Sequence, residues 1–248
     1  MISLRFYGTI ANDPDHPEWN EDYFECDDES SIRKCALSDG ASVSFSPRTW
    51  ARLLVESYLA NGAVNSGWLV DAQARLDAQY DRATFDLLDE IGAFEQGSYA
   101  SLIGLSVDGD NRTLSITGIG DSILAIVNHA SLVCIASFPY TQSSQFHASP
   151  LLLPSLAKHN STVFSNETAP SFTLAKNLDD LRDCVILLMT DAIGAWFMRS
   201  IEDADERWKE LLDIESKEEF KTLVVGERET HRLRVDDTTL VVLDHAIS

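Results

Sequence analysis

Short apolar runs bounded by turn residues recur along the whole of this 248-residue sequence. They predict β-strands over residues 2–8, 22–26, 32–38, 98–107, 113–119, 122–128, 131–138, 184–190 and 238–243. Successive runs are not each separated by a helix, which favours antiparallel sheets over the strand–helix alternation of a parallel sheet. No repeat, Pro-rich linker or low-complexity tract divides the chain, so we expect a single domain over residues 1–248.

Helical periodicity predicts the layers that cover these sheets. Pro47 after Ser46 marks the start of a helix that carries Trp50, Leu53 and Tyr58 on one face. A second apolar stripe predicts one helix over residues 69–91, and further helices are predicted over residues 192–200, 203–213 and 216–225. Helix pairs between groups of strands predict an α+β fold, a four-layer αββα sandwich of two antiparallel sheets flanked by helices.

The charge balance limits the partners. The chain carries 40 Asp and Glu residues against 19 Lys and Arg residues, a formal net charge of −21 at pH 7. Nucleic acids and anionic membranes bind basic surfaces, so we expect neither as a partner. The longest apolar run, residues 184–189, is far shorter than the roughly 18 residues of a membrane span. The first residues lack the pattern of a secretory signal, and we therefore expect a cytoplasmic protein.

Two other features are less informative. The cysteines Cys26, Cys35, Cys134 and Cys184 are too scattered to predict a disulfide framework or a zinc site. Residues 139–180, rich in Ser, Pro and Asn, are the least regular part of the pattern, and we expect them to form a flap that helps to select substrates.

Several aspartates stand at the ends of predicted strands. Asp39 and Asp191 directly follow strands, Asp22 opens one, Asp237 precedes one, and Asp121 lies between two. In an antiparallel pair, the C-terminal end of one strand lies beside the N-terminal end of its neighbour. The hairpin of residues 22–38 would thus bring Asp22 to Asp39, with Cys26 facing Cys35. Pairing of the strands 184–190 and 238–243 would bring Asp191 to Asp237.

Clustered carboxylates repel one another and require bound cations or protons. A ligand set of oxygens alone selects hard ions such as Mg²⁺ or Mn²⁺. Two such ions bridged by an aspartate acidify a shared water for attack on phosphorus, which indicates a phosphate-ester hydrolase. The alternative is that aspartates at strand ends are ordinary turn residues.

An ordered series of motifs adds a resemblance to this interpretation. The series consists of Asn20-Glu21-Asp22, Asp39-Gly40, Gly97-Ser98, Gly120-Asp121-Ser122, Thr190-Asp191 and Asp236-Asp237-Thr238-Thr239. Each motif stands against a strand of the expected kind. Together, over about residues 5–244, they resemble the motif set of the metal-dependent protein phosphatases, the protein phosphatase 2C family.

The resemblance implies a serine/threonine protein phosphatase that hydrolyses phosphomonoesters through a water activated by two metal ions, Mn²⁺ or Mg²⁺. Its catalytic residues would be Asp39, Asp191 and Asp237. By position, Asp39 would bridge both ions, the carbonyl of Gly40 would bind one of them, and Asp191 and Asp237 would complete the other.

The resemblance also implies roles for residues around the two metal ions. Glu21 and Asp22 would hold waters on the metals, and Asp121 resembles the ligand of an accessory third metal. The implied partners are phosphoserine and phosphothreonine proteins and a cognate serine/threonine kinase system.

The sequence departs from the family pattern at two places. The pattern DGxGG reads Asp-Gly-Ala-Ser-Val over residues 39–43, and Ala41 stands where many eukaryotic members carry a proposed general-acid histidine. Pro17 stands where the family has the arginine that grips substrate phosphate, and His16 and Arg48 are the nearby candidates for that contact.

Two other functions therefore stay open beside the phosphatase. The first is a catalytically weak or inactive phosphatase-fold module with a regulatory or binding role, which the missing arginine motivates. The second is a simple acidic cation-binding protein.

Overall fold

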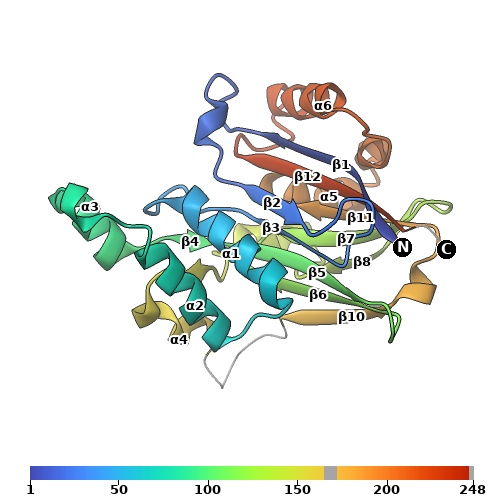
Figure 1. Cartoon of the computed structure of the whole chain (residues 1–248). Helices are drawn as coiled ribbons and strands as arrows, with labels where there is room; N and C mark the ends of the chain where they lie inside the picture. The colour runs from blue at the N-terminus through green and yellow to red at the C-terminus, as the bar shows by residue number, and fades with distance from the viewer. Residues whose placement is uncertain (165–171, 246–248) are drawn as a thin grey trace.

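The computed structural model describes residues 1–164 and 172–245, which form two five-stranded antiparallel sheets packed face to face (Figure 1). The first sheet has the order β1-β12-β11-β7-β8, with bounds Ile2–Ile10, Thr238–His245, Cys184–Met189, Ile123–Asn128 and Val133–Phe138. The second has the order β10-β6-β5-β3-β2, with bounds Thr173–Asn177, Thr113–Ile119, Leu102–Asp108, Lys34–Ser38 and Tyr23–Cys26. A short pairing joins β4 (Tyr99–Ala100) to β9 (Leu153–Pro154).

Helices cover the outer face of each sheet (Figure 1). The second sheet is covered by α1 (Pro47–Asn61) and α2 (Ser66–Asp77), and the first by α5 (Asp191–Glu202) and α6 (Lys217–Glu229). The short helices are α3 (Leu87–Ile91), α4 (Ser161–Phe164), η1 (Pro17–Trp19), η2 (Arg82–Thr84), η3 (Gly92–Gln96), η4 (Ser143–His147), η5 (Ala157–His159), η6 (Leu178–Leu181) and η7 (Glu206–Leu212).

Apolar packing divides the molecule into the layers of the predicted sandwich. Ile103, Ile126 and Leu188 belong to a buried cluster between the two sheets. Trp50 belongs to the cluster between the second sheet and its helices, and Phe197 to the cluster on the other side. Because apolar area removed from water contributes about 25 cal/mol per Å², these layers hold the two sheets in place. The prediction of a four-layer αββα sandwich is confirmed.

The strand pairings that bear on the aspartates are confirmed as well. In the hairpin of β2 and β3, Tyr23 pairs with Ser38 and Cys26 faces Cys35, and both thiols are free. β11 and β12 are antiparallel neighbours, and Met189 pairs with Leu240. Asp22 and Asp39 therefore stand at the same end of the β2–β3 pair. Asp191 and the aspartates before β12 stand at the same end of the β11–β12 pair.

The prediction of a single helix over residues 69–91 is wrong beyond Asp77. The helix α2 ends there, and α3 begins separately after Asp86, whose side chain accepts hydrogen bonds from the backbone N–H groups of Leu88 and Asp89. This N-cap starts a new helix where the apolar stripe suggested continuity. Leu87, expected in the buried stripe, is 71% exposed.

Smaller differences occur elsewhere. The predicted strand over residues 98–107 is divided at Ser101 into β4 and β5, and the helix predicted over residues 203–213 is the 3₁₀ helix η7. The expected flap contains the unpredicted strands β9 and β10, and its residues 165–171 lie outside the described part of the chain. Within residues 1–164 and 172–245, no helix has the length and apolar character that crossing a membrane requires.

Candidate metal centre

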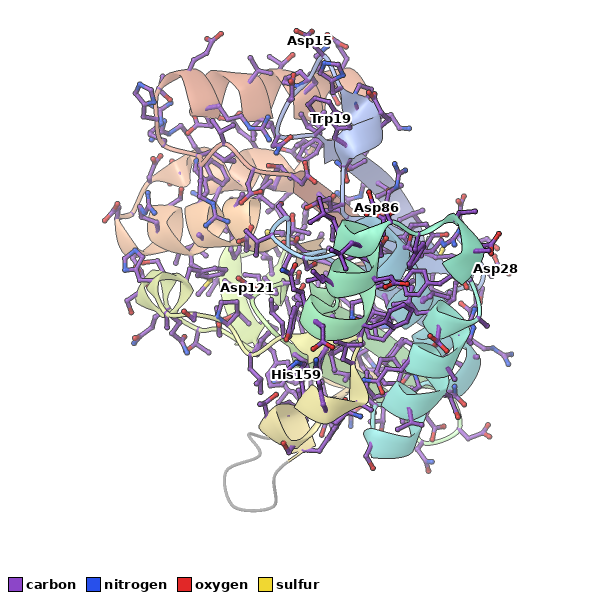
Figure 2. All side chains as sticks on the ribbon, turned by 90° about the vertical axis from the view of Figure 1, so that its left-hand side faces the viewer. Asp15, Trp19, Asp28, Asp86, Asp121 and His159 are labelled. Carbon is purple, nitrogen blue, oxygen red and sulfur yellow. The ribbon has the colours of Figure 1, made fainter. Side chains whose placement is uncertain are left out.

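Acidic residues from both sheets meet at one end of the sandwich. The carboxylate Oδ2 of Asp22, beside β2 in the second sheet, accepts a hydrogen bond of 2.6 Å from Thr239 Oγ1 on β12 in the first sheet. Thr239 in turn is tied to β11, because its N–H donates to Thr190 Oγ1 over 2.9 Å. The open ends of β2, β3, β11 and β12 therefore converge, and Asp121 lies at the same end of the molecule (Figure 2).

A small cavity of about 150 Å³ opens at this convergence. Its lining includes four carboxylates, Asp39, Asp121, Asp191 and Asp236, together with Gly40 and the following residues Ala41 and Ser42. Asp39, Asp121 and Asp191 are among the site residues predicted from the sequence, and all three line this cavity. Asp236 was not predicted.

The chain at Asp39 is fixed by a break in the neighbouring strand. Ser101, which separates β4 from β5, donates its N–H to the carbonyl of Asp39 over 2.9 Å. Its hydroxyl lies 2.6 Å from the Ser122 hydroxyl, so one serine links the segment of Asp39 to the segment of Asp121. A Cβ at Gly40 would lie 2.8 Å from the backbone of Pro47, and this close approach of α1 requires glycine.

Burial and mutual repulsion perturb the cluster. Burial, reinforced by Asp237 and Asp191, raises the pKa of Asp22 well above 3.8, and burial with Asp22 and Asp191 nearby does the same to the pKa of Asp39. Burial, with Asp191 adding repulsion, raises the pKa of Asp121 to about 7. Carboxyl groups in this condition are stabilised either by protons or by a cation placed among them.

Arg234 is the cation that the chain itself supplies, and the sequence analysis missed it. Its Nη2 contacts the Oδ2 of Asp191 and lies 2.8 Å from the Oδ2 of Asp236. Burial raises the pKa of Asp191, and the charge of Arg234 opposes that rise. Residues 231–236 form turns and bends before β12, so no strand or helix periodicity in the sequence pointed to Arg234.

The two neighbouring aspartates before β12 have different environments. Asp237, the predicted ligand, accepts hydrogen bonds from the backbone N–H of Asn12 over 2.7 Å and of Glu21 over 2.6 Å, and it is absent from the cavity lining. Asp236 lines the cavity instead. Asp237 ties the segment of Glu21 to β12, and the side chain that faces Asp39 and Asp191 is that of Asp236.

Asp22 is buried and Glu21 is half-buried, and neither belongs to the cavity lining. The Oε2 of Glu21, the Oδ1 of Asp22 and the Oδ1 of Asp191 have no hydrogen-bond partner among the described residues, although each atom is shielded from solvent. Unpartnered buried carboxylate oxygens are costly, so these three atoms are suited to a cation.

The structure does not bring the two predicted phosphate-binding residues to the cavity. His16 stacks on Trp19 with ring centroids 3.9 Å apart, and its Nδ1 lies 3.0 Å from the Oε1 of Glu18. Arg48 donates to the carbonyl of Glu18 over 2.9 Å. Neither side chain occurs in the lining of the cavity, and both instead hold the segment around η1.

The donor set fits a hard divalent ion. It consists of carboxylate oxygens, with Gly40 in the same lining, and oxygen donors are the ligand chemistry of Mg²⁺ and Mn²⁺. In the described side-chain positions, no three His, Cys, Asp or Glu groups already form a coordination sphere, and Arg234 engages two of the carboxylates. An ion placed among these carboxylates would compete with Arg234 for Asp191 and Asp236.

Comparison with known proteins identifies the fold. Neither a family model nor a curated protein matches the sequence. Solved structures do match, and they include a bacterial serine phosphatase with a TM-score of 0.59 and 13% identity, over 98% of this chain and 98% of that chain. The catalytic domain of the serine/threonine protein phosphatase PstP, solved in complex with two manganese ions, matches with a TM-score of 0.55 and 17% identity, over 98% and 99% of the two chains.

A serine/threonine phosphatase from Staphylococcus aureus matches with a TM-score of 0.55 and 14% identity, over 99% of this chain and 97% of that chain. At these identities the matches establish a shared fold. The chain thus has the sandwich fold of bacterial serine/threonine phosphatases along nearly its whole length, as the resemblance of its motifs predicted.

Proposed function

We propose that this chain is a metal-dependent serine/threonine protein phosphatase. The main support for this proposal is that Asp39, Asp121, Asp191 and Asp236 line one cavity. This cavity lies at one end of a sandwich that has the fold of solved serine phosphatases. The substrates would be phosphoserine and phosphothreonine proteins. We further propose that a cognate serine/threonine kinase system phosphorylates these substrates and that the protein is located in the cytoplasm.

The cofactors would be two Mn²⁺ or Mg²⁺ ions, with Asp121 as a ligand of a third. The structure of PstP contains two manganese ions, and the carboxylate oxygens around the cavity here suit ions of this kind. When bound, such ions supply a Lewis acid that stabilises charge on phosphoryl oxygens and acidifies water. We assign Asp39, the carbonyl of Gly40, Asp191 and Asp236 as the holding groups.

Asp236 replaces Asp237 in this assignment, and Asp237 becomes a positioning residue. With both oxygens on backbone N–H groups, Asp237 orients the segment that carries Glu21 and Asp22. The buried guanidinium of Arg228 supports the same turn, since it donates to the carbonyls of Ala11 and Asp236. These contacts hold the backbone of residues 11, 12, 21 and 236 in one arrangement, which supports the segments that carry the carboxylates.

Hydrolysis of p-nitrophenyl phosphate tests the proposal. We expect activity with Mn²⁺ that EDTA abolishes. Asp39→Asn should lower kcat/KM by about 100-fold or more. Loss of a residue that only supports a metal ligand costs about 10- to 100-fold, and Asp39 is assigned as a ligand itself. Asp110→Asn, at the exposed turn between β5 and β6, is the matched control. Activity that ignored both EDTA and Asp39→Asn would contradict the proposal, and bound Mn²⁺ without turnover would favour the inactive binding module.

The choice between Asp236 and Asp237 has its own test in the thermal shift caused by Mn²⁺. An ion that binds only the folded chain raises the Tm by mass action. We expect Asp236→Asn to remove most of this Mn²⁺-dependent shift. Asp237→Asn should instead lower the Tm without Mn²⁺, because it weakens the acceptor of two backbone N–H groups, and should retain a clear response to Mn²⁺. If Asp237→Asn removed the Mn²⁺-dependent shift and Asp236→Asn retained it, the metal ligand would be Asp237 and not Asp236.

A further inference from the structure

A second cavity, of about 220 Å³, lies directly beside the acidic one. It is bounded by α5, η4 and the segment before β12. Its polar lining consists of the arginines Arg199, Arg232 and Arg234, the histidines His147 and His231, and Ser143, and we call it the cationic cavity after its arginines. The volume is several times the roughly 30 Å³ share of one water molecule, so the cavity admits a carboxylate or a phosphate group.

This concentration of arginine is unusual for a chain with a net charge of −21. Arg199 is exposed on α5, and among the described residues no carboxylate pairs with it. Arg232 binds Glu227 through Nε and Nη2, and the contacts found for Arg234 use its Nη2. Each guanidinium has five N–H donors in a planar fork, and donors of both arginines are left over for a further anion.

The carboxylates near this cavity are already engaged. Glu227 accepts hydrogen bonds from Trp196 Nε1 over 2.9 Å and from Arg232, and it forms an ion pair with Arg207. Glu202 accepts a hydrogen bond of 2.8 Å from the backbone N–H of Ser143 at the start of η4. Arg232 and Arg234 are thus paired with acids outside the cavity lining, and Arg199 is the arginine of the lining that has no ion pair among the described residues.

Arg234 is shared by the two cavities. It lines the cationic cavity while its Nη2 contacts Asp191 in the acidic one. Ala192, the residue after Asp191, also belongs to the cationic lining. A group bound there would thus be a neighbour of a phosphate bound among the aspartates, with Arg234 between them.

We propose that this cationic cavity binds a second anionic group of the phosphoprotein substrate, located close in sequence to the phosphorylated residue. The inference rests on the proposed phosphatase function. Arginine forks match carboxylate and phosphate oxygens, and the apolar floor formed by Phe146 and Trp196 accommodates the methylene groups of the side chain. The anion is the carboxylate of an acidic residue or a second phosphate.

Peptide kinetics with Arg199→Gln test this inference. The substrates are phosphoserine peptides with neutral flanks, with glutamates flanking the phosphoserine on both sides, and with a second phosphoserine. Wild-type protein should show the lower KM on the anionic peptides. Arg199→Gln should raise the KM for these peptides relative to the neutral peptide by up to about fivefold, the range of an exposed charge pair, with little change in kcat.

Arg33→Gln is the matched control. Arg33 is likewise exposed, and it immediately precedes β3 at the end opposite Asp39. This variant loses the same charge and should keep the wild-type preference. Equal KM values for neutral and anionic peptides, or equal effects of the two variants, would overturn the inference.

Two further outcomes are separated by design. A preference for the doubly phosphorylated peptide alone identifies a phosphate as the second anion, and a preference for both anionic peptides identifies any carboxylate or phosphate. Absence of hydrolysis of p-nitrophenyl phosphate by the wild type would defeat the phosphatase proposal and not the cavity. Fluorescence anisotropy of a labelled glutamate-flanked phosphopeptide then tests binding directly, and equal affinity of wild type and Arg199→Gln would overturn the cationic site.

Discussion

Glu227 on α6 joins three structural elements through its carboxylate. It accepts from Trp196 on α5, pairs with Arg207 on η7 over 3.2 Å, and binds Arg232 through two hydrogen bonds. Its side chain is only 10% exposed, so these contacts act in a partly desolvated place. The hydrogen bond from Arg232, with help from Trp196 and the charge of Arg207, lowers the pKa of Glu227 below 4.5.

We therefore expect Glu227→Gln to destabilise the fold by about 2 kcal/mol at neutral pH, the scale of hydrogen bonds to a charged group. A carboxyl group whose folded pKa is lowered contributes stability above its unfolded pKa and loses it as the pH falls through the folded value. The difference between wild type and variant should thus shrink towards about pH 3. Urea unfolding at both pH values measures it.

Glu229→Gln, an exposed change on the same helix, is the control for this measurement and should cost little. A difference between Glu227→Gln and wild type that persisted unchanged at low pH would show that the charge of Glu227 is not what stabilises this junction.

Residue spacing predicted part of the candidate site and missed another part for a physical reason. Antiparallel pairing of β2 with β3 places Asp22 and Asp39 at the same end of one hairpin, as predicted, whereas the approach of Asp39 to Asp191 depends on the packing of the two sheets. The choice between residues 236 and 237 depends on which of two adjacent side chains faces the cavity. Backbone N–H groups of Asn12 and Glu21 decide it, and these groups come from a loop without a periodic pattern.

At the scale of elements, the fit of α1 on the second sheet depends on one missing side chain. A Cβ at Gly104 on β5 would lie 2.6 Å from the Cε1 of Tyr58, whose ring is fully buried on α1. We expect Gly104→Ala to destabilise the fold by about 1 to 3 kcal/mol, because overpacking forces backbone or rotamer shifts. Denaturant unfolding measures the change.

Gly109→Ala provides the comparison, since nothing lies within 4 Å of a Cβ at that turn. It should be close to neutral. A cost for Gly104→Ala equal to that for Gly109→Ala would mean that α1 shifts freely on the sheet.

The strands and the flanking helices followed from periodicity, and the errors have local causes. The stripe over residues 69–91 continues through Leu87, but the capping box at Asp86 starts a separate helix. Tyr80, just beyond the end of α2, makes ring contacts with Phe45 and Phe85. β10 was not predicted, because its edge position beside β6 leaves alternate residues exposed and lowers its apolar content.

At the scale of the whole molecule, the candidate site lies where the two sheets meet, and the chain around it is strongly acidic. Asp22 and Thr239 join the sheets at that point. A net charge of −21 creates a negative potential that an anionic substrate must cross before it reaches any local cations. The field acts over the Debye length, about 30 Å at 0.01 M salt and 8 Å at 0.15 M.

Ionic strength should therefore change phosphopeptide hydrolysis in a direction set by the peptide's charge. For a phosphoserine peptide with neutral flanks, we expect kcat/KM to rise severalfold between about 0.01 M and 0.15 M salt, because screening removes long-range repulsion. A peptide with enough flanking lysines to carry a net positive charge should show the opposite trend, since screening weakens its attraction. Measuring both at one fixed Mn²⁺ concentration separates this field from any effect of salt on the metal, which is common to the two substrates. Rates that changed in parallel for both peptides would mean that the acidic surface does not govern how substrate approaches the site.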